Sequence, residues 1–138
     1  MELNSPYSYL LSAAYFAETS VIAEQDGRLA GFVWAFRSPP EPQALFVWQI
    51  GVASDARGEG LGKQLLKRLL ARPACRGVRY LEATVTPSNT ASAALFRALA
   101  RELDAPCAVT PAFPSESFPG GAHEPEDLFR IGPIPPIN

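Results

Sequence analysis

An apolar segment followed at once by a glycine-rich loop and an amphipathic helix constrains this chain more than any other feature. Residues 44–52 (ALFVWQIGV) are almost entirely apolar, which is typical of a central strand covered on both faces. Three glycines follow between residues 58 and 62, and beyond them Leu65, Leu66 and Leu69 recur with a helical period. The sequence therefore predicts a strand, a short loop and a helix in this order, as in α/β proteins.

The glycine loop has the properties of an anion-binding segment. Glycines let the backbone approach a ligand closely, and the helix that follows adds unpaired N–H groups and the positive end of its dipole. Between Arg57 and Arg79 lie seven of the twelve basic residues and one acidic residue, Glu59. The alternative is an ordinary tight turn before a solvated basic helix face, and the pattern alone leaves both interpretations open.

The spacing of the loop excludes two familiar phosphate-binding motifs. A P-loop needs Gly-Lys-Ser/Thr, but Lys63 is followed by Gln64, and the dinucleotide fingerprint does not fit glycines spaced by two. The pattern that fits is Arg/Gln-x-x-Gly-x-Gly/Ala, filled by Arg57, Gly60 and Gly62. It resembles the acyl-CoA pyrophosphate loop of the GNAT acetyltransferase superfamily.

Composition narrows the class of protein further. The 138 residues predict a single domain over 1–138, and 47% apolar residues exclude a disordered chain. A net charge of −2 argues against nucleic acid as a partner, and no apolar run is long enough to cross a membrane. Two cysteines, Cys75 and Cys107, lie in no metal-binding or redox spacing, so we expect no metal and a cytoplasmic protein.

Periodicity and turn residues predict the order of the elements. Eight of the 14 prolines lie in residues 106–138, which predicts an irregular, proline-rich end carrying one late strand. The expected elements are a helix over 6–17, strands over 19–24, 29–36, 44–52 and 78–85, a helix after Gly62, a helix capped by Ser88 or Asn89, at most a short strand over 107–109, and a strand over 127–134. With the superfamily resemblance, this order implies an α/β GNAT fold, with a mixed and mostly antiparallel central sheet covered by helices. The superfamily's first strand is expected to be missing, because the chain opens at the first helix.

A second element of the superfamily pattern follows at the expected distance. Thr86-Pro87-Ser88-Asn89 ends a predicted strand and precedes a predicted helix. The resemblance implies that Asn89 faces the pantetheine arm of the cofactor or its sulfur, whereas the alternative is a helix N-cap and nothing more. Many members carry a tyrosine seven residues later that protonates the leaving thiolate, but that position is Phe96 here. Another group or water would then supply the proton.

Four further segments make the resemblance more specific. Together they resemble the branch of the superfamily that acetylates L-2,4-diaminobutyrate in ectoine biosynthesis, and the likeness covers almost the whole chain. The segments are residues 3–7 (LNSPY), 46–52 (FVWQIGV), 82–89 (EATVTPSN) and 118–133 (FPGGAHEPEDLFRIGP). The resemblance implies a homodimer and acetyl-CoA as cosubstrate. The cofactor-binding residues that it implies are Ile50, Gly51, Val52, Arg57, Gly58, Glu59, Gly60, Leu61, Gly62, Lys63 and Asn89.

Acetyl transfer to an amine sets requirements on the other side of the site. The amine must lose a proton before it attacks, and the oxyanion of the thioester needs donors, for which the backbone N–H groups of residues 50–52 are candidates. A diamine with a carboxylate calls for acidic and polar groups beside an aromatic wall. The expected catalytic residues are Glu82, Asn89 and Trp48. The expected substrate-binding residues are Tyr7, Trp48, Glu82, Thr84, His123 and Glu126.

Each of these residues also has a purely structural interpretation. Trp48 in so apolar a strand could belong to the core, and Glu82 could face solvent. His123 could be an exposed loop residue, and Glu126 a solubilising charge. Two alternative functions remain open at this point: a GNAT enzyme for another small amine or a protein amine, and an acyl-CoA-binding sensor without turnover.

Overall fold

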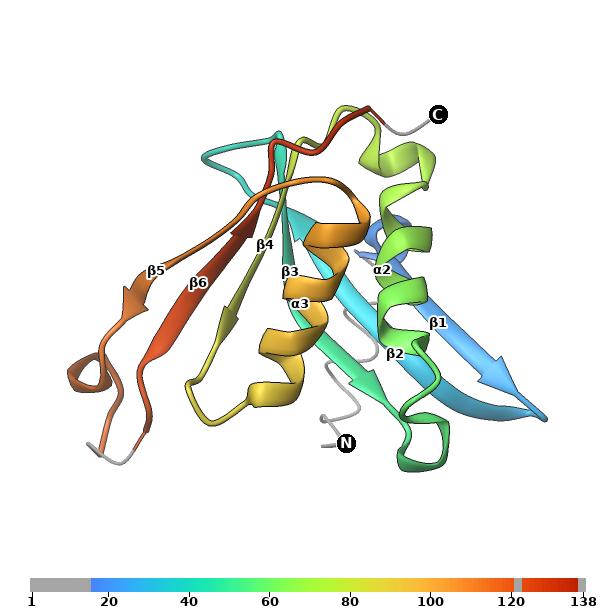
Figure 1. Cartoon of the computed structure of the whole chain (residues 1–138), viewed down its shortest axis with the longest axis horizontal. Coiled ribbons are helices and arrows are strands. Elements are labelled where there is room, and N and C mark those ends of the chain that lie inside the picture. The colour runs from blue at the N-terminus through green and yellow to red at the C-terminus, as the bar shows by residue number, and fades with distance from the viewer. Residues whose placement is uncertain (1–15, 121–122, 137–138) are drawn as a thin grey trace. The chain divides into compact units, whose positions relative to one another are not determined.

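The computed structural model describes residues 16–120 and 123–136 (Figure 1). Its strands are β1 (Ser20–Gln25), β2 (Arg28–Arg37), β3 (Ala44–Val52), β4 (Tyr80–Val85), β5 (Cys107–Phe113) and β6 (Glu126–Ile131). Its α-helices are α2 (Leu61–Leu70) and α3 (Thr90–Glu102), with short 3-10 helices at Ala17–Thr19, Ser54–Ala56, Pro73–Cys75 and Ser115–Ser117. The chain divides into two compact units. The first is Met1–Val78 with Pro136–Asn138, and the second is Arg79–Pro135.

The first unit is an antiparallel sheet in the order β1-β2-β3 with α2 on one face. Asp26 and Gly27 have φ of 53° and 75°, so the β1–β2 hairpin turns as its Asp-Gly pair predicts. Four leucines of α2 are buried where the helix packs on this sheet, namely Leu65, Leu66, Leu69 and Leu70. The helix comes so close at Gly31 that a Cβ there would lie 2.9 Å from Leu65 Cδ1.

An irregularity in β3 decides which side chains face that helix. Trp34 of β2 pairs with Gln49 and Ala35 pairs with Val47, so Trp48 is the extra residue of a β-bulge. If Trp48 occupied a regular position in the ladder instead of bulging, strict alternation would turn Gln49 toward α2 and Ile50 away from it. The bulge restores the apolar side of the strand and leaves Trp48 on the opposite face.

Arg37 fixes the end of β2 to the segment that follows α2. Its guanidinium donates hydrogen bonds to the backbone oxygens of Pro42 at 2.6 Å, Ala74 at 3.0 Å and Arg76 at 2.5 Å. Backbone oxygens in loops need such donors when no ladder supplies them. The first unit is thereby closed at the end opposite the β1–β2 turn.

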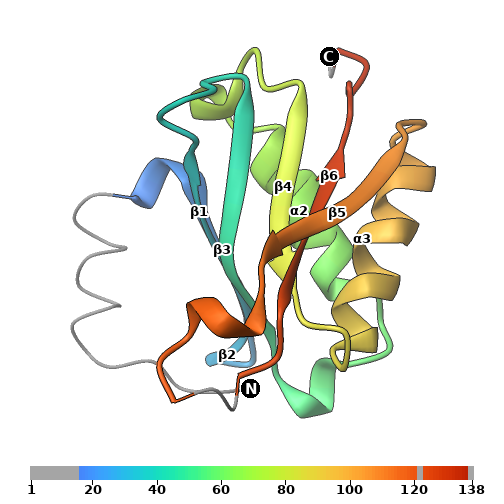
Figure 2. The ribbon, with the colours of Figure 1, turned by 90° about the vertical axis from the view of Figure 1, so that its left-hand side faces the viewer.

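The second unit is an antiparallel sheet in the order β4-β6-β5. Helix α3 lies along one side of it (Figure 2), and Phe96 of α3 packs on Phe129 of β6 with ring centroids 6.3 Å apart. Leu81, Ala83 and Val85 alternate with half-buried residues along β4 and are themselves buried. The face opposite α3 therefore carries the alternate residues of β4 and β6.

The prolines of the last third misled the sequence prediction. Residues 106–138 hold two paired strands rather than one, because β5 runs to Phe113 and includes Pro111. Within this unit β5 pairs with β6 alone, and a strand with one neighbour tolerates a missing N–H group. β6 ends at Ile131, three residues earlier than expected, and β4 begins two residues later. The helix expected over 6–17 falls almost wholly outside the described residues.

Candidate functional site

The glycine loop reaches α2 through two left-handed residues. After the 3-10 turn Ser54–Ala56, Arg57 is extended, and Gly58 and Gly60 have φ of +84° and +74°. Apart from the glycine and its two chain neighbours, no described residue has an atom within 4 Å of the position that a Cβ would take on either glycine. The backbone conformation, not crowding, requires glycine here, and the space in front of the loop is open to a ligand.

The loop ends in a helix start that has no side-chain cap. Gly60 is the N-cap of α2, and the first helical hydrogen bond runs from Gln64 N to its carbonyl oxygen at 3.1 Å. The first-turn N–H groups of a helix lack intrahelical partners, and its positive dipole end favours an anion. Arg57 is exposed beside them, with Nε 3.4 Å from the Val52 oxygen, and Glu59, Leu61, Gly62 and Lys63 complete the predicted segment.

The end of β3 before this loop contains two predicted groups: the backbone of residues 50–52 and the aromatic ring of Trp48. Ile50, Gly51 and Val52 pair with β2 and are half-buried. Trp48 is 44% exposed and packs on Trp34 with centroids 5.9 Å apart. The core interpretation of Trp48 is therefore wrong, because the bulge holds this ring at the surface.

In the second unit, three side chains gather on the sheet face opposite α3. Glu82 of β4 stands directly opposite Arg130 of β6, and Glu82 Oε2 accepts a hydrogen bond from Arg130 Nη1 at 2.6 Å. The Arg130 guanidinium lies 3.8 Å above the ring centre of Tyr80. The side chain of Glu82 is only 12% exposed, so it is not a solvated strand residue.

Two more predicted residues follow the same strands. Thr84 is two residues beyond Glu82 on β4, and Glu126 is on β6 in phase with Arg130, so strand alternation puts them all on one face. Both are half-buried. The structure therefore brings Glu82, Thr84 and Glu126 to one polar face.

Asn89 caps the N-terminus of α3, as the structural interpretation of this residue expected. It is the N-cap of α3, and its Oδ1 accepts a hydrogen bond from Ser92 N at 3.1 Å. This bond uses the carbonyl side of the amide. The role toward a pantetheine arm therefore stays a prediction that the cap does not exclude.

His123 lies in the segment between β5 and β6, not against Glu82. It is exposed, its ring stacks on Phe118 with centroids 3.9 Å apart, and its Nδ1 is 2.5 Å from the Glu124 backbone oxygen. Glu124 in turn accepts hydrogen bonds from the N–H and the hydroxyl of Ser88, at 3.1 and 2.5 Å. The loop that carries His123 is thereby fixed beside the start of α3. Tyr7 lies outside the described residues.

Sequence reasoning missed Arg130 as a site residue. The signal was available, since Arg130 interrupts the apolar run Leu128-Phe129-Arg130-Ile131 in a segment already singled out. A basic residue between buried neighbours on a strand needs an acidic partner across the sheet. The strand register that identifies Glu82 as this partner is not readable from the sequence.

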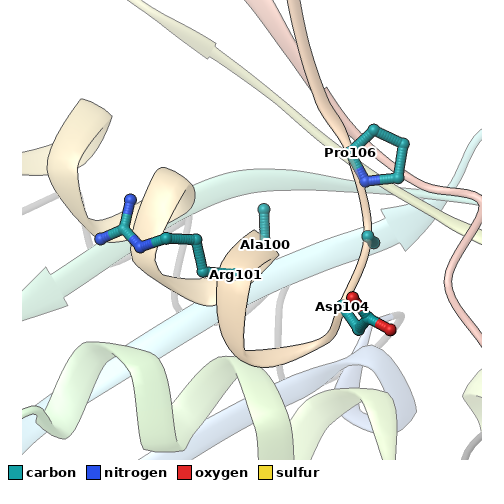
Figure 3. A pocket seen from close by; sticks show the side chains of 5 residues that line it. Ala100, Arg101, Asp104 and Pro106 are labelled. Carbon is teal, nitrogen blue, oxygen red and sulfur yellow. The ribbon is translucent and has the colours of Figure 1, made fainter.

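Three further features of the described residues concern metal binding, membrane helices and a hollow, and none of them involves the predicted site residues. No group of three or more His, Cys, Asp or Glu side chains there could hold a metal ion, and no helix in that part is long and apolar enough to cross a membrane. A hollow of about 440 Å³ lies at the end of α3, lined by Ala100, Arg101, Asp104, Ala105 and Pro106 (Figure 3).

Comparison with known families matches this arrangement. The acetyltransferase (GNAT) family matches residues 2–100. An N-acetyltransferase from Staphylococcus aureus has the same fold at 21% identity, with a TM-score of 0.66 over 92% of this chain and 74% of its own. The fold and the glycine loop thus define a GNAT acetyltransferase, and the expected fold class is confirmed.

More similar proteins identify the branch. L-2,4-diaminobutyric acid acetyltransferases from Halalkalibacterium halodurans and Shouchella clausii are 52% and 48% identical over 99% and 97% of this chain and 72% and 75% of their own. A diaminobutyrate acetyltransferase from Paenibacillus lautus, solved with L-2,4-diaminobutyric acid and coenzyme A, is 48% identical, with a TM-score of 0.92 over 100% of this chain and 84% of its own. The chain belongs to the L-2,4-diaminobutyric acid acetyltransferases and is an acetyl-CoA-dependent acyltransferase.

Proposed function

We propose that this chain transfers the acetyl group of acetyl-CoA to the 4-amino group of L-2,4-diaminobutyrate, giving N4-acetyl-L-2,4-diaminobutyrate for ectoine biosynthesis under osmotic stress. The observation that carries the proposal is the 48% identity, over the whole chain, to a solved acetyltransferase that holds both diaminobutyrate and coenzyme A. The Glu82–Arg130 ion pair of the second unit supports it, because a zwitterionic diamine needs charged partners.

The first unit supplies most of the cofactor-binding residues in this proposal. The open loop at Gly58 and Gly60 and the uncapped start of α2 bind the pyrophosphate of acetyl-CoA through backbone N–H groups. Backbone N–H groups of residues 50–52 stabilise the oxyanion that forms on the thioester carbonyl. Asn89 keeps its cap and contacts the pantetheine arm through its amide nitrogen.

The amine reacts as a neutral nucleophile. Glu82 holds or deprotonates the reacting ammonium, Trp48 offers an aromatic wall to the substrate, and Tyr7, Thr84, His123 and Glu126 contact the rest of it. The nitrogen then attacks the thioester carbonyl, and the tetrahedral intermediate loses one nitrogen-bound proton to a base or to water. The intermediate collapses with cleavage of the C–S bond, and coenzyme A leaves as a thiolate that takes up a proton. Phe96 is 2% exposed and has no acidic hydrogen, so that proton comes from another side chain or from water.

We also propose that residues 1–138 act as one domain in a cytoplasmic homodimer, with residues 106–138 contributing to the substrate side. Two large apolar side chains on strands with a single neighbour support the dimer, since Ile22 of β1 is 60% exposed and Phe113 of β5 is 52% exposed. Sedimentation at micromolar concentration should show a dimer, and a monomer would contradict this part of the proposal.

The decisive experiment measures thiol release from acetyl-CoA with a panel of amines. Release with L-2,4-diaminobutyrate and not with polyamines or peptide amines is the expected result. Release with another amine alone would favour a different GNAT acetyltransferase. Acetyl-CoA binding without release for any amine would favour a sensor. Mass spectrometry of the product, compared with the 2-acetyl isomer, checks which nitrogen is acetylated.

A further inference from the structure

We propose that Arg130 is a positioning residue for the amine: it fixes the Glu82 carboxylate through one oxygen, so that the other oxygen is presented to the substrate ammonium. This inference rests on the proposed function, because it assigns Arg130 to the same amine site. It adds a residue from β6 that the sequence pattern did not identify as functional.

The contacts on Glu82 divide its two oxygens. Oε2 accepts from Arg130 Nη1 at 2.6 Å, the short distance of a charge-assisted hydrogen bond. Among the described residues nothing donates to Oε1. A carboxylate held at one oxygen keeps a defined orientation while its second oxygen can accept a hydrogen bond from a ligand.

Arg130 is itself held by the ring beneath it. Tyr80 precedes Glu82 by two residues on β4 and so lies on the same face, and the guanidinium stacks 3.8 Å above its centre. The strand register sets Arg130 directly across from Glu82. Ring, guanidinium and carboxylate therefore form one chain of contacts that ends at Oε1 of Glu82, to which no described residue donates.

Loss of Arg130 would release this orientation. The Glu82 side chain is 12% exposed, and a half-buried carboxylate without its cation would turn toward water or toward another donor. The geometry for the ammonium would be lost even though the charge of Glu82 remained. An effect through Glu82 must disappear when Glu82 no longer carries a charge, and this property makes the inference testable.

The test is a double-mutant cycle with Arg130→Met and Glu82→Gln, read as steady-state constants for both substrates. Arg130→Met should change the same constant for diaminobutyrate that Glu82→Gln changes, by about tenfold or more, with the KM for acetyl-CoA unchanged. In the Glu82→Gln background, Arg130→Met should change that constant less than about twofold. Arg130→Lys should recover part of the loss, since it keeps the charge but not the planar stack.

Arg97 provides a matched control on the other side of the same unit. Its guanidinium lies 5.3 Å from the centre of the Phe129 ring, and it is exposed on α3. Arg97→Met removes a stacked arginine without touching Glu82 and should leave the constants for diaminobutyrate unchanged. Thermal melting of each variant checks that the fold is retained.

Three results would overturn the inference. These are additive effects of Arg130→Met and Glu82→Gln, an equal change in the KM for acetyl-CoA, and an Arg130→Met enzyme with unchanged constants. The wild-type amine panel tests the proposed function separately. If the wild type acetylates another amine, the cycle is run with that amine. If it acetylates none, the cycle is read from diaminobutyrate affinity by calorimetry.

Discussion

The glycine loop of the first unit and the polar face of the second are adapted to charge in opposite ways. The loop offers backbone: two left-handed glycines, an uncapped helix start and open space in front of both. The polar face offers side chains: a carboxylate, a guanidinium and a ring that hold one another in register across two strands. A backbone site depends on conformation, whereas a side-chain site depends on which partners stand opposite.

This difference predicts different responses to substitution. The loop should tolerate changes at exposed side chains such as Glu59 but no added group where an anion must come close. The polar face should respond even to isosteric changes, because removing one charge leaves its partner unpaired.

Gly60→Asp should abolish measurable acetyl-CoA binding while the fold is retained. The carboxylate would occupy the place of a phosphate oxygen and add a negative charge at the start of α2. Calorimetry with acetyl-CoA measures the loss. Gly60→Asn is the matched control, since it has the same shape and the same left-handed backbone without the charge, and it should retain more affinity. Unchanged affinity in a folded Gly60→Asp variant would reject the loop assignment.

Glu82→Gln should impair the amine side and spare the cofactor side. If Glu82 binds the ammonium, the KM for diaminobutyrate should rise; if it also relays the proton, kcat should fall by roughly two to four orders of magnitude. The affinity for acetyl-CoA should stay nearly the same, because the loop after β3 lies in the other unit. An enzyme with both constants unchanged would remove Glu82 from the site.

Gly132→Ala should destabilise the second unit by about 3 kcal/mol. A Cβ at this position would lie 2.5 Å from both the Arg79 oxygen and Tyr80 Cδ1, so either the chain end or the ring beneath Arg130 must move. Urea unfolding measures the free energy. Gly77→Ala is the control: its φ of +83° is also left-handed but nothing lies near its Cβ position, so about 1 kcal/mol is expected. Equal losses for the two would contradict the steric account.

Trp48→Ala should raise the KM for diaminobutyrate by about three- to tenfold, the size of a cation–π contact at a partly exposed site. Trp48→Phe should be milder, because it keeps an aromatic wall. The bulge leaves this ring 44% exposed, so neither change should lower the melting temperature by more than a few degrees. A large loss of stability in Trp48→Phe would indicate that the ring is structural after all.

The two cysteines, Cys75 in the first unit and Cys107 in the second, should differ only slightly in the reactivity of their thiols. Burial raises the pKa of Cys75 above its ordinary 9.0, against the opposing charges of Arg37 and Arg72, and burial also raises the pKa of Cys107, against Arg97. Both thiols should react slowly with a disulfide reagent at pH 8, and half-buried Cys107 should react before buried Cys75.

The raised pKa values also set a pH dependence of stability. Unfolded thiols ionise as the pH rises through 9.0, while the folded ones stay protonated, so the folded protein binds more protons in that range. The free energy of unfolding should therefore decrease modestly above pH 9 and be flat for these groups below it. Replacing either cysteine by Ser should reduce this slope.

The glycine loop could be predicted from the sequence better than the polar face could, and the reason is physical. The glycine loop over residues 57–63 could be located from the sequence, because a left-handed backbone demands glycine, and the superfamily resemblance then suggested its role. Arg130 could not be predicted as a site residue, because its role depends on which residue of β4 lies opposite it. Strand register is a long-range property that the local sequence does not show. β3 lies between these cases. Its bounds were predicted to the residue, but its bulge was not.

The hydrophobic pattern of β3 did indicate the bulge. Leu45 and Val47 alternate toward α2, and Ile50 and Val52 do so again after a shift of one position, which is what an extra residue requires. Reading the strand as uniformly apolar concealed the break in alternation. The length of β5 was missed for a different reason, since a proline excludes a central strand but not one with a single neighbour.

The bulge at Trp48 has a consequence for how relatives of this chain can diverge. A relative that lost the single residue at position 48 could keep a regular β2–β3 ladder and the same apolar face toward α2, because residues 47 and 49 already pair with neighbouring positions of β2. The only side chain removed would be the exposed ring. A one-residue gap here in an alignment would thus mark a protein that retains the scaffold and lacks the ring that we propose as the aromatic wall. If the substitutions at Trp48 bear out that role, such a gap can sort candidate enzymes by substrate before any is purified.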